Sequence, residues 1–158
     1  MVYTMNNNIF LKDEKGEKQA LNFIWDLYDK AEQGDVDVTF VKLLQLALEH
    51  IEKAETFPLG KNEIYNTTLT LEENGINKKI DLIKPLLNSP VCELRMDWYP
   101  EYCFRAIFFP YKHEGENYYC FTKAFFKKGR YNPTDLFRDQ AKQIYTRFLM
   151  KQQIFPSN

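Results

Sequence analysis

Apolar residues in the first third of the chain recur with the period of an α-helix. Between residues 20 and 31 they fall at every third or fourth position, and Gly34 ends the stripe. A second stripe covers residues 40–54, with Asp37 as the expected N-cap. The short connection between the stripes predicts two antiparallel helices packed as a hairpin. Residues 2–11 are expected to form a strand before them.

The period changes to two in the second half of the chain. Apolar and charged residues alternate over residues 92–98, which is typical of a strand with one buried face. Residues 102–109 and 118–126 predict two more strands with a hairpin loop between them. Asn132 is the expected cap of a last helix. The order strand, two helices, antiparallel meander and helix predicts an α+β domain.

The segment between the helical stripes and the meander is harder to interpret. Residues 64–71, "IYNTTLTL", predict an extra strand, and residues 76–87, "INKKIDLIKPLL", predict a short helix or loop broken by Pro85. No internal repeat or linker divides the chain. We therefore expect residues 1–158 to form a single domain.

Composition supports a globular protein of the cytoplasm. Hydrophobic residues make up 44% of the 158 positions and aromatic residues 16%. The start, "MVYTMNNNIF", lacks the pattern of a signal peptide, and no apolar run approaches the ~20 residues of a membrane span. The cysteines have no metal-ligand spacing and are expected to be reduced, buried thiols: Cys92, Cys103 and Cys120.

The charge is divided unequally along the chain, although the net charge is only −1. Residues 1–90 hold 10 Lys and Arg against 15 Asp and Glu, a net charge of −5. Residues 91–158 hold 11 against 7, a net charge of +4. This asymmetry indicates that an anionic partner would bind the C-terminal half.

Several chemistries lack the residues they need. The two serines, Ser89 and Ser157, are outside any nucleophile-elbow pattern, and the glycines are too scattered for a phosphate-binding loop. No cluster of His, Cys and Asp has ligand spacing, so we expect neither a metal nor a cofactor. His50 and His113 are expected to be structural or exposed.

Arg105 interrupts the apolar run "CFRAIFFP". A buried guanidinium without a partner costs several kcal/mol or more, because it cannot lose its charge. Either it pairs with Glu93 or Asp97 across the strands, or its strand has an open face where a cation is useful. The spacing of the residues leaves both interpretations open.

Two other cations decide whether an anion site can form beside Arg105. Alternation places Arg95 on the face of the two nearby carboxylates and Lys123 on the face of Tyr119 and Phe121. If the strand register brings Arg95, Arg105 and Lys123 together, they make an anion site on an open sheet face.

Four motifs in sequence resemble the phage-derived, HigB-like branch of the RelE/HigB (RelE/ParE) toxin superfamily. They are "CELRM", "FRAIFF", "YYCFTKAFFKK" and "NPTDLFRDQA". Upstream, "KGEKQALNFIWDLYDKAEQG" is similar to the first helix of that family, and "IKPLLNSPVCELR" to its approach to the ELR motif. The resemblance covers nearly the whole chain. Residues 61–80 are the exception and look like an insertion, either outside the central sheet or as an edge hairpin.

The resemblance implies a RelE-like fold, in which an N-terminal helical hairpin packs on an antiparallel β-meander beside a C-terminal helix. It implies the toxin of a type II toxin–antitoxin system, a metal-independent endoribonuclease that cleaves mRNA, usually on the ribosome. The implied partner is a small antitoxin, often of the helix-turn-helix type. The alternative is a catalytically silent phage or prophage protein-binding module of the same fold.

The resemblance also assigns roles to residues. The arginine of the YR motif corresponds to Arg105, that of ELR to Arg95, and the first lysine of F-x-K-K to Lys123. In RNA cleavage the 2′-hydroxyl attacks the adjacent phosphate, so the protein supplies cations that stabilise charge and a base that accepts a proton. Arg105, Lys123 and Arg95 are thus the expected catalytic residues, with Lys123 as the base.

The sequence departs from the family pattern at two positions. Ala124 replaces the second lysine of F-x-K-K, and Phe137 or Leu136 occupies the place of a catalytic tyrosine. Three cations that follow the motif are expected to bind RNA instead: Lys127, Lys128 and Arg130.

Overall fold

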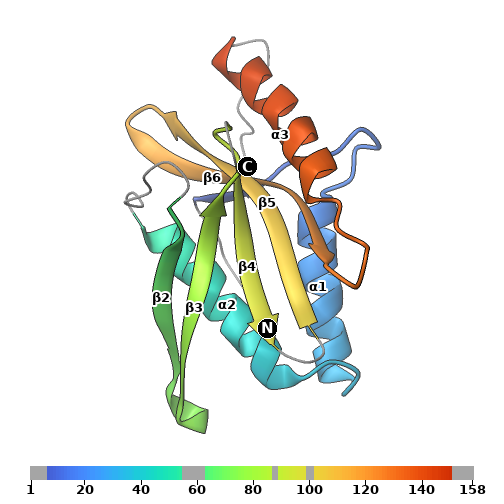
Figure 1. The fold of residues 1–158 in the computed structure, drawn as a ribbon, viewed down its shortest axis with the longest axis vertical. Helices are drawn as coiled ribbons and strands as arrows, with labels where there is room; N and C mark the ends of the chain where they lie inside the picture. Colours follow the sequence, from blue (N-terminus) through green and yellow to red (C-terminus); the bar gives the residue numbers. More distant parts are fainter. Residues whose placement is uncertain (1–6, 55–62, 87–88, 99–101, 151–158) are drawn as a thin grey trace.

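The computed structural model describes residues 7–54, 63–86, 89–98 and 102–150 (Figure 1). Within them the chain forms three α-helices and one six-stranded mixed sheet, which confirms the α+β class. The elements are β1 (Asn8–Phe10), α1 (Gln19–Glu32), α2 (Val38–Lys53), β2 (Tyr65–Leu71), β3 (Ile76–Pro85), β4 (Cys92–Trp98), β5 (Tyr102–His113), β6 (Glu116–Phe126) and α3 (Thr134–Leu149). None of these helices has the length and apolarity that crossing a membrane requires.

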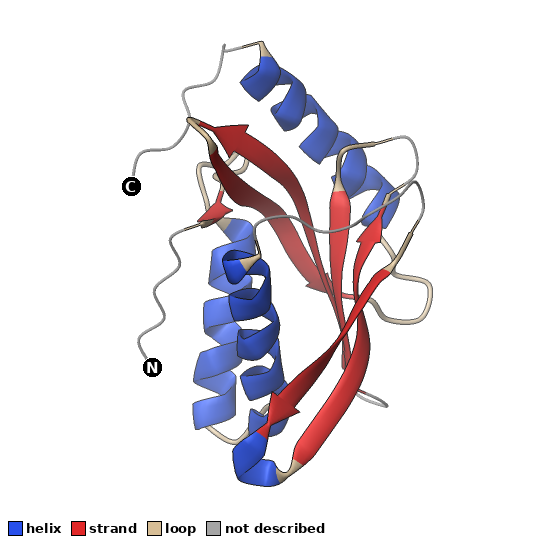
Figure 2. Ribbon diagram, turned by 90° about the vertical axis from the view of Figure 1, so that its left-hand side faces the viewer, coloured by secondary structure: helices blue, strands red, loops and turns tan. Residues whose placement is uncertain are grey.

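The two N-terminal helices form where the apolar stripes predicted them. The Asp37 carboxylate accepts a hydrogen bond of 2.9 Å from the Thr39 N–H and caps α2, as expected. Gly34 has a φ of +80°, a value that ends the preceding helix and disfavours other residues. Both helices stand together on one side of the sheet (Figure 2).

The predicted meander is present, but the sheet is not wholly antiparallel. The strand order is β1-β6-β5-β4-β3-β2, and β4, β5 and β6 are antiparallel neighbours. β1 pairs with β6 in parallel, with Ile9 opposite Cys120. The expectation of a purely antiparallel sheet is therefore wrong at this edge. The first strand covers Asn8–Phe10, and residues 1–6 lie outside the described part of the chain.

The helix or loop predicted for residues 76–87 is instead strand β3, which pairs with β2 as an antiparallel hairpin. Three residues of β3 are paired with β4: Ile83, Lys84 and Pro85. β2 is the last strand in the sheet order and forms its edge. The apolar residues of this hairpin lie in the same core as α1 and α2: Leu69, Leu71, Ile80 and Leu82. Residues 65–80 are thus an edge hairpin that contributes to the main core.

The third helix covers the opposite face of the sheet (Figure 2). It begins at Thr134, and its N-cap is Pro133, so the prediction of Asn132 as the cap is wrong by one residue; the Asn132 side chain accepts only a weak 3.4 Å hydrogen bond from the Thr134 N–H. Its predicted apolar face packs against the sheet through Phe137, Ala141, Ile144, Tyr145 and Phe148. The sheet therefore has two separate apolar clusters, one under α1 and α2 and one under α3.

The three cysteines are free thiols. Cys92 and Cys120 are buried, and burial raises the pKa of each to about 12. Cys103 is half-buried on β5. These positions agree with the expectation of packed, unreactive thiols, most closely for the first two.

Candidate functional site

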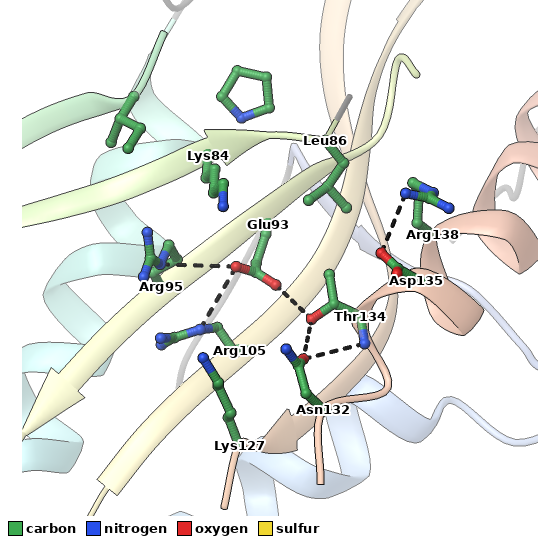
Figure 3. A pocket seen from close by; sticks show the side chains of 12 residues that line it. Lys84, Leu86, Glu93, Arg95, Arg105, Lys127, Asn132, Thr134, Asp135 and Arg138 are labelled. Atoms are coloured by element: carbon green, nitrogen blue, oxygen red, sulfur yellow. Dashed lines mark hydrogen bonds and ion pairs between the residues drawn. The ribbon is translucent and has the colours of Figure 1, made fainter. Parts of the chain in front are cut away.

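A cavity of about 550 Å³ opens where β3, β4 and β5 meet the start of α3 (Figure 3). Five basic side chains line it: Lys84, Arg95, Arg105, Lys127 and Arg138. The two acidic side chains in its wall are Glu93 and Asp135, and its apolar side consists of Ile64, Pro85 and Leu86. We call this cavity the cationic pocket.

Arg95 and Arg105 lie directly opposite each other on β4 and β5. The Glu93 carboxylate lies beside both, with Oε1 3.8 Å from Arg95 Nε and 3.6 Å from Arg105 Nε. Because two guanidinium groups in register repel each other, a shared carboxylate stabilises their proximity. Arg95 Nε is buried and donates no hydrogen bond to any described residue.

Arg105 is not the open cation that the catalytic interpretation expected. Only 3% of it is exposed, its Nη1 donates to Asp97 Oδ1 at 2.6 Å, and the same nitrogen donates to the Phe104 carbonyl at 2.8 Å. The alternative, pairing with Glu93 or Asp97, is what the structure shows, and both carboxylates take part. Arg105 still forms part of the pocket wall.

Glu93 also connects the sheet to the start of α3. Its Oε2 accepts a 2.9 Å hydrogen bond from the Thr134 hydroxyl, which also lies 2.6 Å from Asn132 Oδ1. Glu93 is 5% exposed. A buried carboxylate with ion-pair contacts at one oxygen and a hydrogen bond at the other holds the two arginines and the first turn of α3 in fixed relative positions.

Lys123 does not join the arginines. β6 contains one extra residue, Thr122, which makes a β-bulge. Because of this bulge, the side chains of Lys123 and Phe121 lie on opposite faces of the sheet. The prediction from simple alternation, which placed both on one face, is therefore wrong. Its Nζ lies 3.5 Å from Asp13 Oδ2 and 5.7 Å from the centre of the Phe137 ring. It lines a second cavity of about 650 Å³, beside the later turns of α3.

Asp13 is held as a carboxylate by several donors. The N–H of Glu17 and the N–H of Lys15 each donate to its Oδ1 at 2.9 Å. The bond from Glu17 contributes most to a lowered pKa of Asp13, and the bond from Lys15 and the Lys123 charge act in the same direction. Lys123 is therefore neutralised by a carboxylate rather than placed among other cations.

Of the three cations expected to bind RNA, one lies at the pocket. Lys127 is exposed and lines it, positioned by its N–H bond of 2.9 Å to the Cys103 carbonyl. Lys128 and Arg130 are exposed in the following turn and are not part of the pocket wall. Lys128 Nζ lies 6.0 Å from the centre of the Phe126 ring.

Sequence reasoning missed two pocket cations, Lys84 and Arg138. Lys84 lies opposite Glu93 on β3, a segment predicted as helix or loop, so its register partner could not be inferred. Arg138 is on the second turn of α3, where it contacts Asp135 at 3.2 Å and Asp139 at 3.0 Å. The spacing of Asp135 and Arg138, three residues apart on a helix, was the available signal.

The two positions that depart from the family pattern lie away from the pocket. Ala124 is fully buried, and the Gln19 amide bonds both its N–H and its carbonyl. Phe137 packs edge-on against Phe125, with ring centres 5.5 Å apart. A lysine at position 124 would be buried between the sheet and α1. The Phe137 side chain packs between α3 and the sheet.

The histidines are also outside the pocket. His50 Nε2 lies 2.8 Å from the Tyr65 hydroxyl, on the side of α2, and burial lowers the pKa of His50. The His113 side chain is 40% exposed at the end of β5. Among the described residues no group of His, Cys, Asp and Glu is arranged to hold a metal ion.

The arrangement as a whole suits an anion that carries several oxygens. Arg95 and Lys127 offer donors at the opening, and the arginine at the base is held rigidly by carboxylates. Comparison with protein-family models, curated proteins and solved structures finds no match for this chain.

Proposed function

We propose that the protein is a metal-independent endoribonuclease of the RelE/HigB toxin type, which binds the RNA backbone in the cationic pocket. One observation carries the proposal: five basic side chains against two acidic ones converge on a single pocket in a chain of net charge −1. Such concentration of positive charge favours a polyanion, because phosphate contacts release counterions.

The pocket residues suggest how cleavage would proceed. Arg95, whose side chain is 25% exposed, would contact a phosphate oxygen through the exposed part of its guanidinium, while its buried Nε stays beside Glu93. Arg105, fixed by Asp97, would add preorganised positive charge behind it. Glu93 lies beside both arginines and takes the place of Lys123 as the group proposed to accept the 2′-hydroxyl proton. The 2′-oxygen then bonds to phosphorus as the bond from phosphorus to the 5′-oxygen breaks, and the departing 5′-oxygen takes a proton from water.

The finer features of the toxin family belong to the same proposal. The helical hairpin on one face, the central meander and the C-terminal helix are the parts of the RelE-like arrangement that the resemblance implies. A helix-turn-helix antitoxin and mRNA on the ribosome are the corresponding partners. The predicted insertion at residues 61–80 begins outside the described residues, and its part from Tyr65 onward belongs to the edge hairpin.

Binding is tested first, by titrating a labelled single-stranded RNA at several salt concentrations. Each phosphate contact on a single strand contributes about 0.7 to the slope of log affinity against log salt. Lys127→Ala should reduce that slope by about this amount. Lys53→Ala, which removes an exposed lysine of α2 on the other side of the sheet, is the control and should leave the slope unchanged.

Cleavage is tested with mRNA and ribosomes, together with growth on induced expression. Arg95→Ala should reduce the cleavage rate by about 10²–10³ and relieve growth arrest. Arg105→Ala is unsuitable, because it would leave Asp97 and Glu93 without their buried partner and destabilise the fold. Wild-type protein that binds RNA without cleaving it would contradict the nuclease part of the proposal.

The catalytically silent binding module is the second candidate. It is favoured by the complete pairing of Arg105 and by the location of both Lys123 and Phe137 outside the pocket. If wild-type protein neither arrests growth nor cleaves mRNA, and RNA binding is equally weak in Lys127→Ala and Lys53→Ala, this second function replaces the first.

A further inference from the structure

The two edge strands of the sheet differ in length and in burial. β1 has three residues, all of them buried, whereas β2 has seven residues and is the outermost strand at the other edge (Figure 1). The backbone of an edge strand carries unpaired N–H and C=O groups along its free side. β2 is therefore the longer of the two edge strands in the described chain.

β2 lacks two of the devices that usually prevent edge pairing, charged side chains and proline. Its sequence, "YNTTLTL", contains no charged residue and no proline. The side chains on its outer face are exposed and small or β-branched: Asn66, Thr68 and Thr70. Its one irregularity is a register shift between Tyr65 and Asn66, at the start of the strand.

The edge is also held in place from behind. Leu69 and Leu71 are buried against the core beneath α2. At the tip of the hairpin, Lys42 of α2 contacts Glu73 at 2.9 Å. A strand fixed in this way loses little conformational entropy when another strand pairs with it, so association costs less.

We propose that two copies of this chain associate through β2, pairing antiparallel about a two-fold axis near Thr68. Thr68 of one copy then lies beside Thr68 of the other, and Asn66 beside Thr70. An uncharged strand opposes no like charges when it meets itself, and threonine pairs are favourable across strands. In this register Ile64, which is 41% exposed just before β2, lies beside Glu72 of the other copy and marks the end of the pairing.

The absence of charged side chains on β2 favours pairing with a second copy of this chain over pairing with a strand of another protein. β2 offers no side-chain charge that would select an acidic or basic partner strand, whereas its threonine-rich pattern complements itself. The inference goes beyond the proposed function and does not depend on RNA binding. A single strand pair buries less than the ~1,200–2,000 Å² of a stable interface, so a weak, concentration-dependent dimer is expected.

Sedimentation equilibrium of the full chain, over roughly a hundredfold range of protein concentration, measures this association. Thr68→Lys places two ammonium groups beside each other at the axis and should raise the dimer dissociation constant by about fivefold or more at low salt. High salt should restore part of the loss, because it screens the repulsion. Thr68→Val should leave the dimer equal or tighter.

Thr146→Lys is the matched control, since it makes the same substitution at an exposed position of α3. It should leave the dissociation constant unchanged. If Thr68→Lys does not fold, Asn66→Lys tests the same edge. A chain that remains monomeric throughout, or a dimer that responds equally to the β2 and α3 lysines, overturns the proposal. A monomer whose β2 amides are protected from hydrogen exchange only by a second protein would identify the other occupant and also overturn it.

Discussion

The two faces of the sheet are built from the same strands but in different ways. Under α1 and α2 the buried cluster is almost wholly apolar, and it includes aromatic rings that pack directly on one another, such as Phe10 and Phe121 at 5.4 Å. Under α3 the apolar cluster is smaller, and beside it lie buried or half-buried charges: Glu93, Arg95, Arg105 and Lys123.

This difference follows from how much of each face a helix can cover. Two helices side by side exclude water from one face, where an ionised group would have no compensation. One helix leaves the end of β4 and β5 open on the other face, so charged groups can be paired there and still reach a pocket. The amount of helical cover thus determines where this domain can place functional cations.

The largest expected effect tests the apolar face directly. Phe108 and Phe109 are adjacent on β5 and both fully buried, but they point to opposite faces. Phe108→Ala should cost about 4–5 kcal/mol of unfolding free energy, and Phe109→Ala about 3 kcal/mol, because α3 is exposed on its other side and can settle into the space. Urea denaturation measures both. An equal or larger cost at Phe109 would break the comparison between the faces.

The next effect concerns the ion pairs of the α3 face. Asp97→Ala should cost about 3 kcal/mol, since the charge of the buried Arg105 then keeps only the longer contact with Glu93 and the hydrogen bond to the Phe104 carbonyl. The double variant Asp97→Ala with Arg105→Met should recover most of this loss, because it removes the uncompensated charge. Chemical denaturation of the three proteins provides the measurement. A double variant no more stable than Asp97→Ala would show that the pair itself stabilises the fold.

A smaller effect separates the faces by pH. Burial lowers the pKa of His50, on the α2 side, so the folded state favours neutral histidine. That contribution is present above 6.5, the ordinary pKa of histidine, and is lost as pH falls through the lowered value. The urea midpoint of wild type should therefore decline below pH 6.5 relative to His50→Gln. Parallel curves for the two proteins would contradict the assignment.

The smallest effect belongs to Asp13, on the α3 side. Its pKa is lowered chiefly by the Glu17 N–H bond, so its carboxylate stabilises the fold above 3.8, the ordinary aspartate pKa, and stability is lost as pH falls further. Asp13→Asn keeps an acceptor for the N–H groups but does not titrate. The wild-type advantage over this variant should disappear in acid. If wild type is still more stable than Asp13→Asn in acid, the difference in stability comes from packing and not from the charge of Asp13.

The sequence was sufficient for the elements with a clear period. Both N-terminal helices, the meander and α3 lie where the apolar pattern predicted them. β3 was missed because Ile76, Ile80 and Ile83 are spaced as on a helix, while its pairing with β2 depends on contacts far from any single period. Tertiary pairing overrides local pattern in such a segment.

The candidate site was less predictable, because it depends on register and on one bulge. The sequence left two interpretations of Arg105 open, and pairing with a carboxylate was one of them. Its simultaneous contact with Glu93 and Asp97 could be predicted only from the register that places Arg95 opposite Arg105. Lys123 was placed on the wrong face because a bulge at Thr122 leaves no mark in the alternation of residues.

The parallel pairing of β1 with β6 has a consequence for synthesis on the ribosome. Asn7 and Asn117, which are hydrogen-bonded in the finished sheet, are 110 positions apart in the chain. The helical hairpin leaves the exit tunnel early, but Phe121, the ring on which Phe10 packs, emerges long afterwards. Bringing β1 and β6 together closes a long loop, which is slow. Until β6 has been synthesised, the apolar residues that pack against it remain exposed in the nascent chain. Chains released before β6 is made should therefore be substrates for chaperones and proteases rather than stable fragments.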